Sequence, residues 1–299
     1  MMKVGGKDIV MRGRLIRIAR LDEDTYESMK DPEPVLEGLR KSGTRVDLFT
    51  SMQIMPETTP KFSYPMEWDN LAVLPVSTFD HWWKHQIRSL ARNRARQAEK
   101  RGVTLREIPF DDVLVQGIWQ VYNECPFRQG KPFFHYGRDI EAIRNELATF
   151  PDTSIFVGAF LGDTLIGFAK MTCDETYAQA NIMNIVSMVR HKDKAPTNAL
   201  IAQAVRSCAE RGIRYLAYQS FSYGKKQKDS LSDFKENNGF ERVNLPRYYV
   251  PLTATGWVAY RLGLHKRLSD HIPESLLIRY RELRNGWISR KLQSVTEGS

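Results

Sequence analysis

Hydrophobic and polar positions change their period several times after residue 102, and each change predicts a different element. Apolar and polar residues alternate from Val103 to Ile108, as in a half-buried strand. After Asp111, apolar residues recur every three or four positions, as in an amphipathic helix. A polar and aromatic loop, YNECPFRQGKPFFHYGRD, then leads to a second helix that ends near Thr149. The order predicted here is strand, helix, loop and helix.

Six strands and two further helices are predicted next. The turn residues Gly162 and Asp163 separate two apolar runs, which is typical of a β-hairpin. Pro196 suits the first turn of a later helix and Gly212 its end. The predicted strands are 154–161, 164–173, 178–189, 213–219, 240–244 and 248–252, and the predicted helices are 196–211 and 231–238.

The first hundred residues have a weaker pattern. Strands are predicted at 13–21 and 46–54, a small helix at 34–41, and a Pro-rich connection at 55–65. The stretch MEWDNLAVLPVSTFD is typical of another strand that ends at a helix cap. No internal repeat is clear in this sequence, so a complete second domain of the same kind is not predicted.

Positive charge is concentrated in one predicted helix, residues 81–101. Between His81 and Arg106 there are eight Lys or Arg and a single acid, Glu99, a local charge of +7 out of +9 for the whole chain. Like charges four residues apart repel on a helix, so such a face is either solvated or bound to phosphate, RNA or acidic lipid. We predict that Trp82 and Trp83 anchor this helix to the core. The basic stripe comprises Lys84, Arg88, Arg92, Arg96 and Lys100.

Composition narrows the class of protein. The chain has 299 residues, of which 42% are hydrophobic, which is enough for one large core or two smaller domains. Three widely spaced cysteines argue against a disulfide framework or a cysteine zinc site, and favour a cytoplasmic protein. No apolar run is long enough to span a bilayer, which predicts a soluble or peripheral protein. No metal is expected, since only His81 and His85 have helical ligand spacing.

The stretch from Ile182 to Phe240 carries a resemblance to a known family. It reads as strand, polar loop RHKDKAPTN, helix, strand and FKENNGF, and this order resembles the GNAT N-acyltransferase fold over residues 102–253. The resemblance implies a mixed α/β sheet and an acyl-CoA donor whose phosphates face the loop from Arg190 to Asn198. That loop contains no glycine, so side-chain charge would carry more of the donor binding. Its donor-phosphate candidates are Arg190, Lys192, Lys194 and Asn198.

A second resemblance is to the Fem-type aminoacyltransferases and related enzymes of cell-envelope biosynthesis. It rests on Phe234-Lys235 within FKENNGF and on the basic stretch ARNRARQAEKRGV. It implies that Lys235 binds donor phosphate, with Arg88, Arg92, Arg96 and Lys100 as an anion-binding stripe. The expected organisation is an N-terminal α/β region, 1–101, which could be a shortened first GNAT half, then a transferase domain, 102–253, and a helical tail, 254–299.

Candidate catalytic residues follow from the chemistry of amide formation. An amine must lose a proton before attack, and the leaving group must be stabilised. Glu124 and His135 lie in the loop that borders the acceptor in the resembled fold, and Tyr223 lies in a polar loop after a strand. Each has a structural alternative: a solvated helix-end carboxylate, a loop hydrogen-bonder, and an ordinary loop tyrosine.

These observations leave three functional hypotheses. The first is an N-acyltransferase that uses acyl-CoA and a small-molecule or envelope-precursor amine. The second is a Fem-type transferase that uses aminoacyl-tRNA, and the third is a non-catalytic GNAT-like module that binds RNA or acidic lipid. The tail beyond residue 256 is predicted to form amphipathic helices that pack on the core or lie on an acidic membrane surface.

Overall fold

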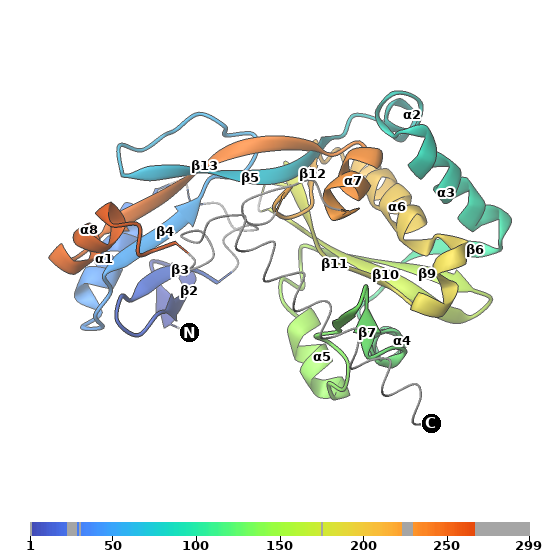
Figure 1. The fold of residues 1–299 in the computed structure, drawn as a ribbon, viewed down its shortest axis with the longest axis horizontal. Coiled ribbons are helices and arrows are strands. Elements are labelled where there is room, and N and C mark those ends of the chain that lie inside the picture. The colour runs from blue at the N-terminus through green and yellow to red at the C-terminus, as the bar shows by residue number, and fades with distance from the viewer. Residues whose placement is uncertain (1, 23–28, 30, 175, 223–229, 267–299) are drawn as a thin grey trace.

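One mixed sheet runs through the molecule in the computed structural model, which describes residues 2–22, 29, 31–174, 176–222 and 230–266 (Figure 1). Within these residues the sheet has eleven strands, in the order β1-β2-β3-β4-β13-β5-β12-β11-β10-β9-β6. Strands that are distant in sequence are neighbours near the middle of this order. Backbone hydrogen bonds therefore join the N-terminal and C-terminal parts of the chain into one sheet.

The first elements of the C-terminal part confirm the predicted order. Each of the two predicted helices begins at a capping aspartate, because the Asp111 side chain accepts the Leu114 N–H and the Asp139 side chain accepts the Ala142 N–H. A two-residue hairpin lies in the loop between them. The bounds are β6 Val103–Ile108, α4 Asp112–Asn123, β7 Phe127–Arg128, β8 Lys131–Pro132, α5 Ile140–Leu147, β9 Ser154–Leu161 and β10 Thr164–Cys173.

The end of the sheet corrects one prediction. β11 (Gln179–Ser187), α6 (Pro196–Glu210), β12 (Tyr215–Ala217) and α7 (Ser230–Asn237) follow in the expected order. The two short final strands, however, are a single strand, β13 (Glu241–Pro251). Pro246 does not interrupt this strand, because it lies just outside the pairing with β4, which begins at Arg247, so no N–H is needed there. The Pro246 carbonyl still accepts the Gln53 N–H at 3.0 Å.

The N-terminal half repeats the topology of the C-terminal half. β1 (Met2–Val4), β2 (Lys7–Arg12) and β3 (Ile18–Leu21) form an antiparallel meander, α1 (Glu33–Lys41) follows, and β4 (Leu48–Met52) is parallel to β3. β9, β10, β11, α6 and β12 have the same order and the same directions. The N-terminal region is therefore a shortened first half of the same fold, and its described residues include no counterparts of β6, α4 and α5.

The two halves exchange their last strands. β5 (Met66–Pro75) follows β4 in sequence, yet it pairs antiparallel with β12 and β13. β13 in turn pairs with β4 of the first half, from Arg247 opposite Met52 to Pro251 opposite Leu48. Neither half can complete its sheet alone, since each lacks the strand that the other supplies.

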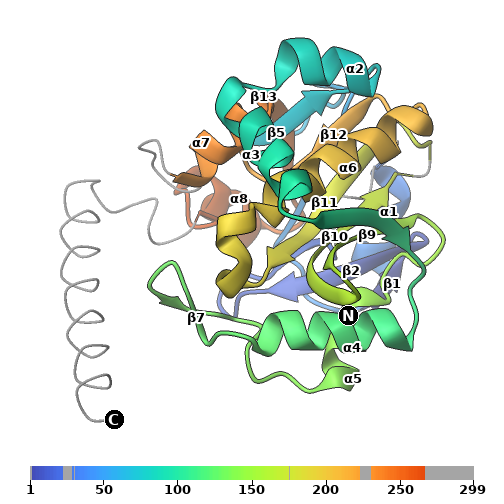
Figure 2. The ribbon, with the colours of Figure 1, turned by 90° about the vertical axis from the view of Figure 1, so that its right-hand side faces the viewer.

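Helices cover both faces of the C-terminal half of the sheet (Figures 1 and 2). α6 packs on β9, β10 and β11 from one side, with α3 (Ser89–Lys100) outside it, and α4 and α5 lie on the opposite side. β9 and β10 are consequently buried along nearly their whole length. Their continuous apolar runs, SIFVGAFL and TLIGFAKMTC, follow from this double coverage.

The basic segment is not the single helix that the sequence predicts. A short helix, α2 (Phe79–His81), continues into a π-helical turn, η1 (Trp82–Gln86), and Ile87 is extended before α3 begins. Lys84 therefore does not share one helical face with the residues of α3. Ile87, the extended residue between η1 and α3, has its side chain buried in the core. The predicted anchors are confirmed, because Trp82 is buried and Trp83 packs partly against the core.

The C-terminal tail is described as far as residue 266. α8 (Ala254–Arg261) begins at Thr253, whose hydroxyl accepts the Gly256 N–H. The amphipathic helices predicted beyond residue 266 lie outside the described residues. In the part of the chain that is described, no helix is long and apolar enough to cross a membrane.

We expect Lys170→Met to destabilise the fold by about 3 kcal/mol, because charge-assisted hydrogen bonds to buried carbonyls would be lost. Lys170 is fully buried in β10, and its Nζ donates to the Leu147 and Thr149 carbonyl oxygens at 2.9 and 2.7 Å, at the end of α5. Urea unfolding measures the free energy. Lys131→Met, at an exposed lysine of β8, is the control and should change it by less than about 0.5 kcal/mol. Equal effects would contradict this role of Lys170.

Candidate functional site

An opening in the sheet lies between β11 and β12. The two strands pair in parallel only from Gln179 opposite Tyr215 to Asn181 opposite Ala217. Beyond that point the chain after β12 follows β5 instead: the Tyr218 N–H donates to the Ala72 carbonyl at 2.8 Å. The remainder of β11 has no strand partner on this side among the described residues, and its side chains from Met183 onward are half-buried.

A β-bulge lies in β11 at the start of this opening. Met171 of β10 is opposite Ile182, but Lys170 is opposite Asn184, so Met183 is the extra residue. A bulge leaves its extra residue outside the regular ladder and redirects the backbone around it. The opening is therefore bordered by main-chain groups of β11 that regular strand pairing would otherwise use.

The predicted donor loop follows β11 directly. It forms a 3₁₀ helix, η2 (Val189–Lys194), after which Ala195 adopts a left-handed conformation with φ of 53° and leads into α6. Arg190 and Lys192 are exposed, and Lys194 lies 3.4 Å from Asp193. Asn198 is in the first turn of α6, where its amide approaches that of Asn238 at 3.5 Å. The structure thus brings all four donor-phosphate candidates to the end of β11; that they bind phosphate stays a prediction.

Glu124, a predicted catalytic residue, holds this loop against α4. The backbone N–H groups of Val189 and Arg190 each donate to one carboxylate oxygen of Glu124 at 2.9 Å. Both oxygens are therefore engaged as acceptors in the described arrangement. This geometry gives Glu124 a positioning role toward η2, and its role as a base stays a prediction.

Lys235 lies at the other side of the opening. It is fully buried, its Nζ donates to the Ser220 carbonyl at 2.7 Å, and it stands 4.6 Å from the centre of the Tyr218 ring. Tyr218 and Ser220 follow β12 directly, so the ammonium sits where β12 leaves β11. Tyr223, the third predicted catalytic residue, lies outside the described residues.

The predicted anion-binding stripe is only partly available to a ligand. Arg92 donates to the Lys84 and Ile87 carbonyls at 3.3 and 2.9 Å, which closes the end of the π-helical turn. Arg88 pairs with Glu236 of α7 at 3.3 Å. Arg96 lies 5.6 Å from the Trp83 ring, and Arg96 and Lys100 are exposed. Leu90 of α3 is 58% exposed.

Gln97 of α3 and Arg101 just after it hold η2 in place, and no local sequence pattern predicts this role. Gln97 Nε2 and Arg101 both donate to the Asp193 carbonyl, at 2.8 and 3.0 Å. Arg101 also pairs with the Asp193 carboxylate at 2.7 Å, which lowers the pKa of that carboxyl together with Lys194. The C-terminal end of α3 is therefore in direct contact with η2. Contacts across ninety residues of sequence have no local signature.

A polar cluster lies on the α4 and α5 side of β11. His135 stacks on Tyr122 with ring centres 4.2 Å apart, and its Nδ1 is 3.6 Å from Glu146 Oε1. Tyr122 is buried, and its hydroxyl has no hydrogen-bond partner of normal geometry within the described residues. The Asn184 side chain lies close enough to this hydroxyl to lower its pKa slightly. Burial lowers the pKa of His135 and raises that of Tyr122. Hydrophobic periodicity places Tyr122 on the core side of its helix, so the sequence predicts packing for this residue and not a contact with His135.

The loop that carries His135 is tied to β11 by Arg128. Its guanidinium donates to the Ser187 carbonyl at 2.5 Å and to the Val121 carbonyl at 2.9 Å, and it lies over the Phe133 ring. Sequence reasoning recognised the loop as polar and aromatic but did not single out this residue. Arg128 connects the loop that carries His135 with the end of β11.

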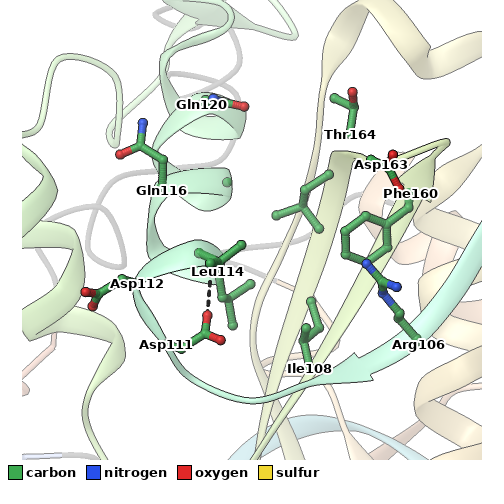
Figure 3. A pocket seen from close by; sticks show the side chains of 13 residues that line it. Arg106, Ile108, Asp111, Asp112, Leu114, Gln116, Gln120, Phe160, Asp163 and Thr164 are labelled. Carbon is green, nitrogen blue, oxygen red and sulfur yellow. Dashed lines mark hydrogen bonds between the residues drawn. The ribbon is translucent and has the colours of Figure 1, made fainter.

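A separate hollow of about 640 Å³ lies beside the edge strand β6 (Figure 3). Asp111 in its wall is already bonded to the Leu114 N–H, and the Arg106 guanidinium lies 4.1 Å over the Phe160 ring. No residue of β11 or η2 lines it. The hollow is thus distinct from the opening. Among the described residues, no group of three or more His, Cys, Asp or Glu could hold a metal ion.

Comparisons with known proteins support the fold. No family model matches the sequence, and no curated protein matches it. The structure is similar to L-PGS from Bacillus licheniformis, with a TM-score of 0.56, 14% identity and 85% coverage of each chain. It is also similar to the C-terminal DUF2156 domain of an Agrobacterium fabrum protein assigned as a lysylphosphatidylglycerol synthetase, with a TM-score of 0.55, 14% identity and coverages of 85% and 82%.

A third similar structure is FemX, with a TM-score of 0.50, 13% identity, and coverage of 79% of this chain and 72% of FemX. The protein has a GNAT-like acyltransferase fold, as the sequence predicted. At these identities the likeness is one of fold.

We expect Ala195→Gly to stabilise the protein by about 0.5 to 1 kcal/mol, because glycine adopts a left-handed conformation without the steric cost that alanine has. Thermal or urea unfolding measures the change. Ala199→Gly, one turn further into α6, is the matched control and should destabilise by about 1 kcal/mol or more, since helix propensity and a buried methyl group are lost. Destabilisation by both substitutions would show that the loop conformation at Ala195 carries no strain.

Proposed function

We propose that the protein is an N-acyltransferase that transfers an acyl or aminoacyl group from an activated donor to an amine. The observation that carries the proposal is the opening between β11 and β12, with the bulge at Met183 beside it. An extended donor would lie along the free side of β11, as an additional strand lies along an edge. Its carbonyl oxygen would accept a hydrogen bond from main-chain N–H groups near the bulge, where negative charge develops during attack.

The acceptor would enter from the side of α4 and α5. This side carries His135, Tyr122 and Asn184 next to β11. The opposite side is filled by α6, whose buried face packs on β10 and β11. A small-molecule or envelope-precursor amine would therefore meet the acyl group across β11.

The distribution of charge favours aminoacyl-tRNA over acyl-CoA as the donor. Glu124 already accepts the Val189 and Arg190 N–H groups, which are then not available to a pyrophosphate. Exposed cations continue from Arg190 and Lys192 to the outer side of α3 through the Arg101–Asp193 contact. Such an extended basic surface suits a polynucleotide backbone better than one coenzyme. Acyl-CoA is the alternative donor.

The site of action that we propose is the cytoplasm, at the inner face of the membrane if the acceptor is an envelope precursor. Cys173 and Cys208 are buried and form no disulfide, which suits a reducing compartment. Three apolar side chains are exposed at α8: Trp257 and Val258 within the helix, and Leu262 directly after it. Arg261 lies over the Trp257 ring. Exposed apolar and basic side chains together suit contact with an acidic membrane surface.

We expect the binding of aminoacyl-tRNA to weaken steeply with salt, because each released counterion adds to the salt dependence. The variant Arg96→Ala/Lys100→Ala should reduce the slope of log K against log salt by up to about 2, at about 0.9 per phosphate contact. Lys41→Ala, on the remote helix α1, is the control and should leave the slope unchanged. Filter binding at several salt concentrations measures the slope. Tight acyl-CoA binding without tRNA binding would assign the donor to coenzyme A instead.

We expect Arg190→Ala and Lys235→Ala each to reduce transfer at least tenfold, because both side chains border the opening. Transfer from each donor to an amine is followed by mass spectrometry, and circular dichroism checks that the fold persists. Arg190 is exposed, so its replacement should not affect stability, whereas Lys235 is buried and can affect both. If wild type transfers from neither donor and neither donor raises its melting temperature, the non-catalytic alternative is favoured.

A further inference from the structure

The acceptor side of the site contains an arrangement of His135, Glu146 and Arg138 that the sequence did not indicate. His135 lies in the loop after α4, and Glu146 lies in the last turn of α5. Nδ1 of His135 is buried and faces Glu146 Oε1 at 3.6 Å, just beyond hydrogen-bond distance, and it makes no hydrogen bond within the described residues. The second carboxylate oxygen of Glu146 accepts from the Arg138 guanidinium.

The orientation of the imidazole is fixed on several sides. Its ring stacks on Tyr122 at 4.2 Å with an angle of 21° between the planes, and the edge of Phe134 meets it at 5.0 Å. The side chain of His135 is 15% exposed although Nδ1 is buried, so the exposed atoms belong to the rest of the ring. Nε2 has no hydrogen-bond partner in the described part of the chain, which places it on the accessible side.

We propose that Glu146 is a positioning residue that holds the proton of His135 on Nδ1, so that Nε2 is the base that accepts a proton from the acceptor amine. A carboxylate facing one imidazole nitrogen favours the tautomer with the proton on that nitrogen and frees the lone pair of the other. Nε2 then takes a proton from the ammonium form of the acceptor, which leaves a neutral amine. This inference rests on the proposed function for the identity of the reaction.

The step balances without any further reactant. The neutral amine forms a C–N bond to the acyl carbon, and the bond from that carbon to the donor oxygen or sulfur breaks. The leaving atom takes up the second proton that the amine nitrogen loses as the amide forms, and the imidazolium formed at His135 returns its proton to solvent. Neutral imidazole is required at the start, so the charges around His135 decide the pH range in which it can act.

Burial, with a smaller contribution from Arg138 and Arg128, keeps the imidazole neutral despite the nearby carboxylate. The groups that face His135 are Glu146 on α5, Tyr122 on α4, and Arg128 and Arg138 in the loop. Burial lowers the pKa of His135 most, Glu146 opposes this, and the two arginines lower it further. Because the folded pKa is below 6.5, the ring is neutral at pH 7 and becomes charged only as the pH falls through that lowered value.

Nitrogen-15 NMR of the His135 ring tests the proposal without any donor or acceptor. In wild type we expect a protonated Nδ1, an unprotonated Nε2 and a pKa below 6.5. Arg138→Gln should raise this pKa, because a positive charge is removed while Glu146 remains. Glu146→Ala should lower it and move the proton toward Nε2, because the acceptor for Nδ1–H is lost.

Reaction with diethylpyrocarbonate provides a second measurement, since this reagent attacks an accessible unprotonated imidazole nitrogen. We expect Glu146→Ala to slow modification of His135 at pH 7 about threefold to tenfold, and Arg138→Gln to move its pH profile upward. Glu141→Ala is the matched control: Glu141 is also on α5, is 69% exposed and pairs with Arg144, so its removal should change neither quantity.

Wild-type NMR alone can overturn the proposal, by showing the proton of His135 on Nε2. Shifts of the His135 pKa in the same direction for Arg138→Gln and Glu146→Ala would also overturn it. If Glu146→Ala does not fold, wild type and Arg138→Gln still decide the question. The expected tautomer without transfer from any donor would instead count against the proposed function and leave the arrangement itself intact.

Discussion

The pairing of β5 with both β12 and β13 is the constraint on which the rest of the structure depends. A strand has only two edges, and one edge of β12 pairs with β5 of the N-terminal half. Beyond Ala217 its chain stays with β5 and leaves β11, so an opening forms in the middle of the sheet. The exchange that joins the two halves therefore also produces the site. Removing β5 would remove both, since no other described strand borders β12 on that side.

Three separate parts of the chain converge on the end of β11. Glu124 from α4 and the Gln97–Arg101 pair around α3 hold η2 from opposite sides, and Arg128 fixes the acceptor loop to Ser187. Each contact joins a charged or polar side chain to main-chain groups that lie outside regular strands and helices. A loop without glycine is in this way held by side chains, and Arg190 and Lys192 of this loop are exposed.

The two sides of the opening differ in chemistry. On the side of η2 and α3 the exposed groups are permanent cations, which suit phosphate. On the side of α4 and α5 the groups are enclosed and close to neutral: a stacked tyrosine and histidine, and a carboxylate whose charge an arginine balances. This separation suits a reaction in which an anionic donor meets an amine that must first lose a proton.

The sequence by itself determined the local elements of the C-terminal half, because hydrophobic period, capping aspartates and turn residues act within a few positions. It also placed the basic loop after β11 and marked the loop that contains His135. Only the tertiary structure decided the exchange of β5 and β13, the continuity of β13 through Pro246 and the break before α3. The contacts of Glu124 with η2 and of Glu146 with His135 were likewise decided there. Backbone pairing and polar contacts between distant segments depend on which edges and faces meet in space, and the local pattern of residues does not contain that information.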